Sequence, residues 1–266
     1  MAKTLFISDI QIGASERGGE QMDKVIYDSL DVDFMTCTEF NIKREKRSLY
    51  LVSNFASLSA NAKDYLKGKR YKIIHNDFLF SQTRNPGIFG GFKVPKDQLI
   101  NIDFILGAEV NFAQSDFQAS IFKLNGFENT YSWNGNLWNE AAIENLVKLE
   151  SGAKNGKVAI IDDPYKNTEG SIKLAQNLRL SFDLIARLPY DQFIEVLSKY
   201  SGFCINVAIP ETFNRILIEA KLMNLLTICN AEMCGATYTE LYQYNGSELG
   251  IKLNEKREEI LKLLKE

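Results

Sequence analysis

Residues 203–229 read FCINVAIPETFNRILIEAKLMNLLTIC and contain one complete strand–helix–strand unit. The run at 203–208 is apolar without a helical period, and Pro210 then marks the end of regular strand structure. Residues 213–223 place apolar side chains at helical spacing, and 225–229 form a second apolar run. Two short apolar strands joined by an amphipathic helix predict a parallel crossover unit, so this segment favours an α/β fold.

The same alternation continues toward both ends of the chain. Continuous apolar strands are typical of parallel sheets that helices cover on both faces, so we predict two doubly wound, Rossmann-type lobes. Their ligand would bind at the carboxyl ends of the strands, in a cleft between two facing sheets. The predicted strands are 4–8, 32–36, 48–52, 71–75, 110–113, 130–133, 158–161, 183–186, 203–208 and 225–229. The predicted helices are 20–30, 59–67, 97–106, 116–124, 169–178, 190–200, 213–223 and 254–266.

The turn-forming sequence SGAKNG at residues 151–156 separates the two series of strands. We therefore predict an N-terminal lobe at residues 1–150, a C-terminal lobe at residues 151–253 and an amphipathic helix at residues 254–266. The terminal helix either caps the second lobe or crosses back onto the first.

The composition is that of an ordinary globular protein. Of 266 residues, 45% are hydrophobic and 24% charged, and the net charge of -3 gives no basic field for nucleic acid. No apolar run approaches the roughly 20 residues that span a bilayer, and the N-terminus reaches Asp9 too soon for a signal peptide. The four cysteines include no CxxC pair, which favours a reduced, cytoplasmic protein.

Two basic clusters occur in the first half of the chain, one at Lys43, Arg44, Lys46 and Arg47 and one within residues 63–72. A solvated basic face is the default interpretation. The sharper interpretation is peripheral contact with an anionic membrane at its cytoplasmic face.

Several kinds of phosphate and metal site are excluded by the residues present. His75 is the only histidine, and Gln11 stands where the Asp-x-His pair of metallophosphoesterases needs an imidazole, so no metal site is predicted. Neither GxGxxG nor GxxxxGK[ST] occurs. Gly18 and Gly19 precede a predicted helix, where they either let the backbone approach a ligand or form a tight turn.

Two glutamates flank the start of the predicted helix at 213–223. Thr212 is expected to cap this helix, whose free N–H groups and dipole favour an anion. Glu211 would lie just before the helix and Glu219 seven residues after Thr212, about two turns or ~10 Å along the axis. The two carboxylates could then accept hydrogen bonds on either side of a phosphate. The alternative is two solvated glutamates in ordinary ion pairs with Arg215 and Lys221.

The pattern P-E-x-F-x-x-x-x-x-E-A at residues 210–220 resembles the donor-site motif of the retaining GT-B glycosyltransferases of group 1, or family 4. Weaker resemblances follow in family order, and together they cover roughly residues 4–236. They lie at Gly18-Gly19-Glu20, at His75-Asn-Asp77, at Ala113-Gln-Ser115, at Asn134-Gly135 and at residues 162–170. The resemblance implies a GT-B fold and sugar transfer from a nucleotide-diphospho-sugar, with retention and without an obligatory metal or other cofactor.

The resemblance also assigns roles by position. Glu219 would bind the ribose hydroxyls, Glu211 a hydroxyl of the donor sugar and Lys166 the leaving diphosphate. His75 would face the sugar from the other lobe together with the backbone of Gly18 and Gly19, although a structural histidine is an equal interpretation. The remaining donor-binding positions are Thr212, Phe213, Asn214 and Arg215.

The chain departs from the family pattern at the donor site. Thr212 and Asn214 replace both glycines of the usual Glu-Gly-Phe-Gly, although Asn tolerates a positive φ better than most residues. The usual arginine upstream of Lys166 is missing. A GT-B-like nucleotide- or glycan-binding scaffold without turnover therefore stays open, as does an epimerase or hydrolase on the same fold. The acceptor, a glycan, lipid, protein or small molecule, leaves no local motif.

Overall fold

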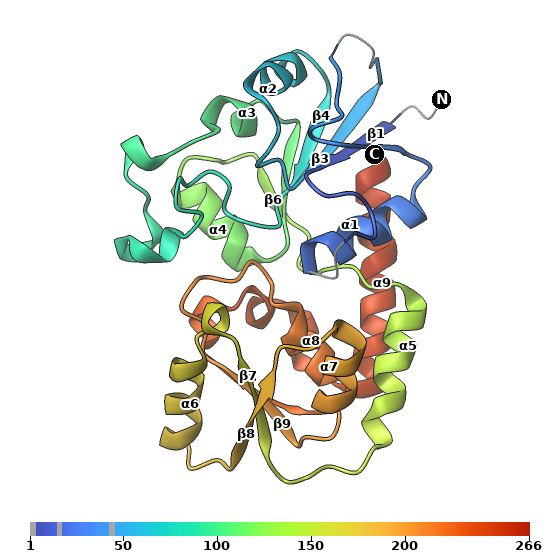
Figure 1. Cartoon of the computed structure of the whole chain (residues 1–266). Coiled ribbons are helices and arrows are strands. Elements are labelled where there is room, and N and C mark those ends of the chain that lie inside the picture. The colour runs from blue at the N-terminus through green and yellow to red at the C-terminus, as the bar shows by residue number, and fades with distance from the viewer. Residues whose placement is uncertain (1–3, 15–17, 43–45) are drawn as a thin grey trace. The chain divides into compact units, whose positions relative to one another are not determined.

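The computed structural model describes residues 4–14, 18–42 and 46–266. Its contacts divide the chain into two compact units, Met1–Leu137 with Arg257–Glu266, and Trp138–Lys256. Each unit is built on its own parallel sheet with helices on both faces (Figure 1). The predicted α/β class with two Rossmann-type lobes is confirmed.

In the described residues, the first sheet has six parallel strands in the order β2-β1-β3-β4-β5-β6. Phe6 of β1 pairs with Phe34 of β2 on one side and with Leu51 of β3 on the other. β2 lies on one side of β1 and β3 on the other, so the order of the strands reverses between β1 and β3. Open sheets of this kind bind ligands at such a switch point. The strands are β1 (Thr4–Ser8), β2 (Asp33–Thr36), β3 (Leu49–Ser53), β4 (Tyr71–Ile74), β5 (Val110–Ala113) and β6 (Thr130–Ser132).

Amphipathic helices bury the two faces of this sheet. One face packs against α1 (Gly18–Ser29) and the end of α9 (Gly246–Lys265) through side chains that include Met22, Ile26 and Leu264. The other face is covered by α2 (Ala60–Lys67), α3 (Ile102–Leu106) and α4 (Asp116–Leu124). The helix predicted at 97–106 is wrong in its first half, because Asn101 adopts a left-handed φ of 57° and α3 begins only after it.

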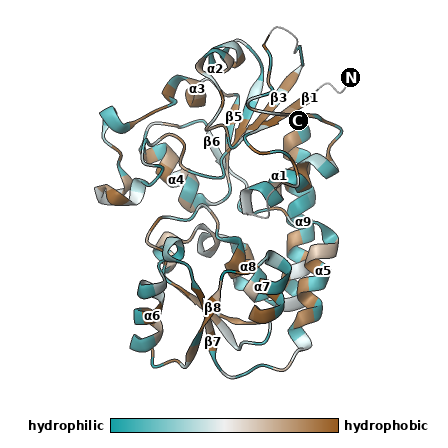
Figure 2. Cartoon of the chain, in the orientation of Figure 1, coloured by the Kyte–Doolittle hydropathy of each residue, from teal (hydrophilic) through white to brown (hydrophobic). Residues whose placement is uncertain are grey.

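The second sheet has four parallel strands in the order β10-β9-β7-β8, within the part of the chain that is described. Its strands are strongly hydrophobic, whereas α6 is largely hydrophilic (Figure 2). The switch point of this sheet lies between β7 and β9. The strands are β7 (Val158–Asp162), β8 (Phe182–Ala186), β9 (Gly202–Ile205) and β10 (Leu226–Cys229). The helices are α5 (Glu140–Lys148), α6 (Thr168–Asn177), α7 (Tyr190–Leu197) and α8 (Arg215–Leu222).

Two segments show how the chain is shared between the units. Trp138 and α5, which was not predicted, pack into the hydrophobic core of the second unit. The helix predicted at 254–266 is the last part of the longer α9. Leu249 and Leu253 of α9 belong to the core of the second unit, and Ile260 and Leu264 to the first. None of the helices in the described residues is long and apolar enough to cross a membrane.

Candidate functional site

At the carboxyl edge of the first sheet, polar side chains form a continuous hydrogen-bonded network. Asp23 of α1 accepts hydrogen bonds from Ser8 Oγ at 2.7 Å and from Ser53 Oγ at 2.8 Å, at the ends of β1 and β3. Ser53 Oγ accepts from Asn76 Nδ2 at 2.9 Å, and Asn76 Oδ1 accepts from Gln114 Nε2 at 2.9 Å. The network therefore links the ends of four neighbouring strands.

Asp23 is the charged centre of this network. It is only 2% exposed, and burial raises the pKa of its carboxyl to about 6 against the opposing effect of its hydrogen bonds. Gly19, one turn earlier in α1, lies close to Asn76, because a Cβ at Gly19 would be 3.2 Å from Asn76 Nδ2. The two predicted glycines are thus the first residues of α1. At Gly19, the absence of a side chain leaves room for Asn76.

His75 lies in the hydrophobic core of the first unit and is 1% exposed. Its Nε2 lies 2.9 Å from Asn111 Oδ1, and since Asn111 Nδ2 donates to a backbone carbonyl, Nε2 is the donor. Its ring centroid is 4.3 Å from that of Phe122, and burial lowers the pKa of the imidazole to about 4. A ligand cannot reach this neutral ring in the present conformation, and the role predicted for His75 stays a prediction.

The second unit brings together Lys166 and Glu211, two residues predicted to act on the donor. Lys166 ends the 3₁₀ turn Pro164–Lys166 after β7, and Glu211 lies in the loop after β9. Lys166 Nζ donates to Glu211 Oε1 at 2.6 Å, and both side chains are about one-third exposed. This ion pair lies at the switch point of its sheet and is accessible to a ligand.

Asparagines shape the loops around this ion pair. Asn167 has a left-handed φ of 55°, caps α6 and donates from Nδ2 to the carbonyl of Asn206 at 2.7 Å, which ties the loops after β7 and β9 together. Asn214 has φ 71° and caps α8, which begins at Arg215. The cap predicted at Thr212 is therefore wrong. The positive φ explains why asparagine is tolerated in place of a glycine.

Glu219 and Arg215, also predicted to contact the donor, lie in the interior of the second unit. Glu219 is 1% exposed and accepts a hydrogen bond from Trp138 Nε1 at 3.0 Å. Arg215 Nε lies 3.6 Å from Glu219 Oε1, and the Arg215 guanidinium stacks 4.1 Å from the centroid of the Trp138 ring. Burial and the neighbouring Glu219 carboxylate raise the pKa of Tyr190. A ribose could reach Glu219 only by displacing these side chains. Phe213, likewise predicted, is 1% exposed in the core.

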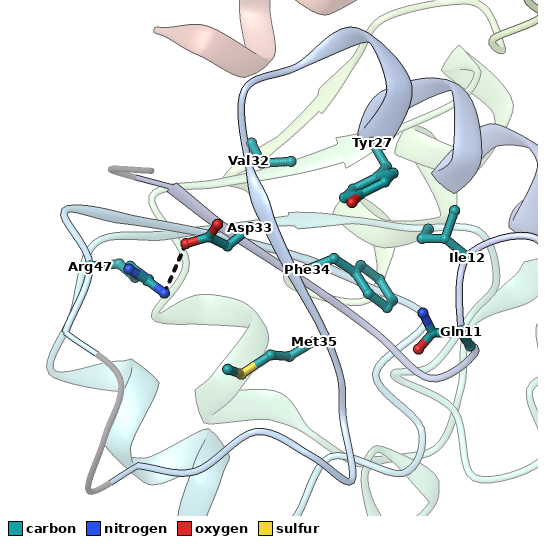
Figure 3. Close-up of a pocket in the computed structure, with 8 residues that line it drawn as sticks. All are labelled: Gln11, Ile12, Tyr27, Val32, Asp33, Phe34, Met35 and Arg47. Carbon is teal, nitrogen blue, oxygen red and sulfur yellow. Dashed lines mark ion pairs between the residues drawn. The ribbon is translucent and has the colours of Figure 1, made fainter. Parts of the chain in front are cut away.

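A separate cavity of about 480 Å³ lies at edge strand β2 of the first unit (Figure 3). Its wall is mixed: Tyr27, Phe34 and Ile12 face one another on one side, and an ion pair of 2.9 Å joins Arg47 to Asp33 at the other side. Arg47 belongs to the first predicted basic cluster, whose members Lys43 and Arg44 lie outside the described residues. The pair neutralises Arg47, so this cavity has no net charge for an anion.

Sequence reasoning missed Asp23, Trp138 and Asn206. A signal existed for Asp23, because it lies among Met22, Val25 and Ile26 on the buried stripe of α1, where an unpaired charge would be costly. For Trp138 and Asn206 the pattern carries no such signal, since their partners are far away in the sequence.

Comparison with known proteins identifies the fold. No family model matches the chain, and no curated protein matches its sequence. The chain has the two-lobed, GT-B-like Rossmann architecture. A solved structure that it resembles is that of the Anabaena protein Alr3699/HepE in complex with UDP and glucose. The TM-score is 0.56 at 13% sequence identity, covering 97% of this chain and 89% of that one.

Proposed function

We propose that the protein is a glycosyltransferase that transfers a sugar from a nucleotide-diphospho-sugar to an acceptor, with retention of configuration and without an obligatory metal or other cofactor. The observation that carries this proposal is the contact of 2.6 Å between Lys166 and Glu211, which the family resemblance assigns to the diphosphate and to the sugar. The likeness of fold to a protein bound to UDP and glucose supports a nucleotide-sugar donor.

The proposed chemistry follows from charge. Departure of the diphosphate develops negative charge, and a cation placed at the leaving group stabilises that charge most when water is partly excluded. A bound diphosphate competes with Glu211 for Lys166. Glu211, released from the ion pair, then accepts a hydrogen bond from a hydroxyl of the donor sugar. The backbone N–H groups at the start of α8 add a favourable dipole. The buried ring of His75 has no part in this scheme.

Calorimetric titration of the protein with UDP and with uridine tests the proposal. We expect Lys166→Ala to raise the dissociation constant of UDP about tenfold, equal to about 1.4 kcal/mol, and to leave that of uridine unchanged. Lys173→Ala is the matched control, because Lys173 is an exposed lysine on the following helix. Equal losses for UDP and uridine would remove Lys166 from the diphosphate site, and GDP and ADP are titrated in parallel to identify the base.

The enclosure of Glu219 favours a second candidate, nucleotide or glycan binding without turnover. In that case UDP-glucose binds to the wild type at the Lys166 site but releases no UDP, with or without an acceptor. Release of UDP together with glycosylated acceptor supports the transferase, and release of free glucose supports a hydrolase.

A further inference from the structure

The cavity at edge strand β2 lies along a strand whose side chains are only partly covered. In the described residues β2 pairs with β1 alone, and residues 32–35 are half-buried, whereas every residue of β3 is buried. The cavity volume of about 480 Å³ falls within the roughly 300–1,000 Å³ that small-molecule sites occupy. All of its lining residues belong to the first unit, which therefore has room for a ligand of its own.

One side of the cavity presents an aromatic surface (Figure 3). The rings of Tyr27 and Phe34 meet edge to face, with their centroids 5.9 Å apart and their planes at 73°. Phe34 leaves at least one face of the Tyr27 ring uncovered in this geometry, and Tyr27 is 39% exposed. Phe34 in turn packs edge to face against the fully buried Phe6 of β1. Tyr27 is thus an accessible apolar surface that the core supports from behind.

The cavity also carries groups that can bind hydroxyls. The ion pair joins Arg47 Nη2 to Asp33 Oδ2 at 2.9 Å, and the backbone N–H of Arg47 donates to Tyr50 Oη at 3.2 Å, so the guanidinium is held in place. The Asp33 side chain is 43% exposed. Because the pair is made through Oδ2, Oδ1 of the same carboxylate can accept a hydroxyl. Gln11, an exposed residue beside the aromatic rings, adds an amide that both donates and accepts.

The charge of the cavity selects the class of ligand. Among the described residues that line it, only Arg47 and Asp33 are charged, and they neutralise each other. A phosphate would have to displace Asp33 from Arg47, and a purely apolar ligand would desolvate the Asp33 carboxylate without replacing its hydrogen bonds to water. A sugar ring has apolar C–H groups on its faces and hydroxyls around its edge, so it matches both sides of the cavity.

We propose that this cavity binds a neutral carbohydrate, with one sugar ring against Tyr27 and its hydroxyls hydrogen-bonded to Asp33 Oδ1 and to Gln11. The cavity belongs to the first unit, whereas Lys166 and Glu211 belong to the second. Carbohydrate binding here therefore requires neither a nucleotide nor sugar transfer, and it is independent of the proposed function.

Saturation-transfer NMR tests the site with neutral trisaccharides at millimolar concentration: maltotriose, cellotriose, xylotriose and triacetylchitotriose. We expect at least one of them to bind. Tyr27→Ala should raise its dissociation constant about tenfold, equal to about 1.4 kcal/mol, whereas Tyr27→Phe, which keeps the ring, should leave it nearly unchanged. Tyr131→Ala is the matched control, because Tyr131 is 46% exposed on β6, the other edge strand of the same sheet. No saturation transfer to any trisaccharide would overturn the proposal, as would an affinity that Tyr27→Ala does not change.

Asp33→Ala distinguishes a carbohydrate from an apolar ligand. Because this substitution removes the acceptor for a hydroxyl, we expect it to raise the dissociation constant of the trisaccharide about tenfold as well. Asp31→Ala is its control, since Asp31 is an exposed carboxylate just before β2 and does not line the cavity. A loss of affinity in Tyr27→Ala with none in Asp33→Ala would assign the cavity to an apolar molecule and overturn the proposal.

Competition with UDP shows whether this site is separate from the donor site. We expect the dissociation constant of the trisaccharide to be the same with and without saturating UDP, and the same in Lys166→Ala. Loss of trisaccharide binding in either case would place the carbohydrate at Lys166 and contradict the proposal. Failure of the wild type to bind UDP, GDP or ADP would contradict the proposed function and leave the Tyr27 and Asp33 readouts decisive.

Discussion

The carboxyl edges of the two sheets occupy equivalent places in two similar units, yet they treat polar groups in opposite ways. In the first unit, Asp23, Ser53 and Asn76 are bonded to one another, with Asp23 and Ser53 buried and Asn76 half-buried. In the second, Lys166 and Glu211 form a charged pair that is about one-third exposed. A closed network is fixed because each bond depends on its neighbours, whereas an exposed ion pair contributes little and is easily exchanged for a ligand. The second edge is therefore the better candidate for binding.

Glu219 tests this comparison within the second unit, because it is predicted to bind ribose and yet lies in the interior. Replacing it with Ala would remove the Glu219 carboxylate that lies beside the buried Arg215 guanidinium and the acceptor of Trp138. Breaking a buried pair in this way costs about 3–5 kcal/mol. We expect a loss of that size in the free energy of unfolding, measured by urea denaturation and tryptophan fluorescence.

Glu195→Ala is the matched control, since Glu195 forms an exposed pair with Lys199 at 3.2 Å, and we expect less than about 0.5 kcal/mol. A small stability loss in Glu219→Ala, joined to a large loss of UDP affinity, would instead return Glu219 to the binding site and weaken the contrast between the two edges.

The second prediction concerns two buried groups of the first unit that titrate in opposite directions. The pKa of Asp23 is raised from 3.8 to about 6 in the folded state, so the folded chain binds more protons and stability falls as the pH rises through this window. The pKa of His75 is lowered from 6.5 to about 4, so the unfolded chain binds more protons and stability rises over nearly the same window. Each effect is about 3 kcal/mol, and the two nearly cancel.

Single substitutions should separate these effects. As the pH rises from 4 to 6.5, we expect the free energy of unfolding of Asp23→Asn to increase by about 3 kcal/mol relative to that of the wild type, and that of His75→Gln to decrease by about 3 kcal/mol. These changes with pH do not depend on how stable each variant is at any single pH. Urea unfolding followed by Trp133 fluorescence in a Trp138→Phe background reports on the first unit. If the stability of the wild type and of both variants changed with pH in the same way, the network would be open to water. That result would contradict the contrast between the two carboxyl edges.

Much of this architecture could be predicted from the sequence, because apolar runs and helical spacing are local signals. Residues 203–229 gave a correct crossover unit, and the positive φ of Asn214 agrees with the tolerance expected of asparagine. The left-handed Asn101, which shortens a helix, left no signal in the helical pattern.

The candidate site was predicted less completely, because spacing along the chain does not report burial. The family resemblance assigned Glu211 through the motif at 210–220 and Lys166 through the weaker match at 162–170, and the structure shows the two side chains in contact. The same motif could not indicate that Glu219 is enclosed by Trp138, which lies 81 residues earlier, or that the His75 ring points into the core. Such outcomes depend on which distant side chains fill the surrounding space.

The smallest expected effect belongs to Gly19, where the closed network meets the start of α1. A Cβ there would lie 3.2–3.3 Å from three side-chain atoms of Asn76, so Gly19→Ala must displace an amide that bonds both Ser53 and Gln114. Against this loss stands the better helix propensity of Ala, and we expect a net loss of about 1 kcal/mol by urea denaturation.

The double substitution of Gly19 and Asn76 shows whether the contact with Asn76 or the helix propensity of Ala determines the effect of Gly19→Ala on stability. In an Asn76→Ala background the close contacts with Nδ2 and Cγ are gone and only the contact with Cβ at 3.3 Å remains, so Gly19→Ala should cost less there than in the wild type. Gly90→Ala, with nothing within 4 Å of its added Cβ, should change stability by less than about 0.5 kcal/mol. An equal loss from Gly19→Ala with and without Asn76 would mean that α1 does not depend on this contact, and that the first edge is less tightly closed than its hydrogen bonds indicate.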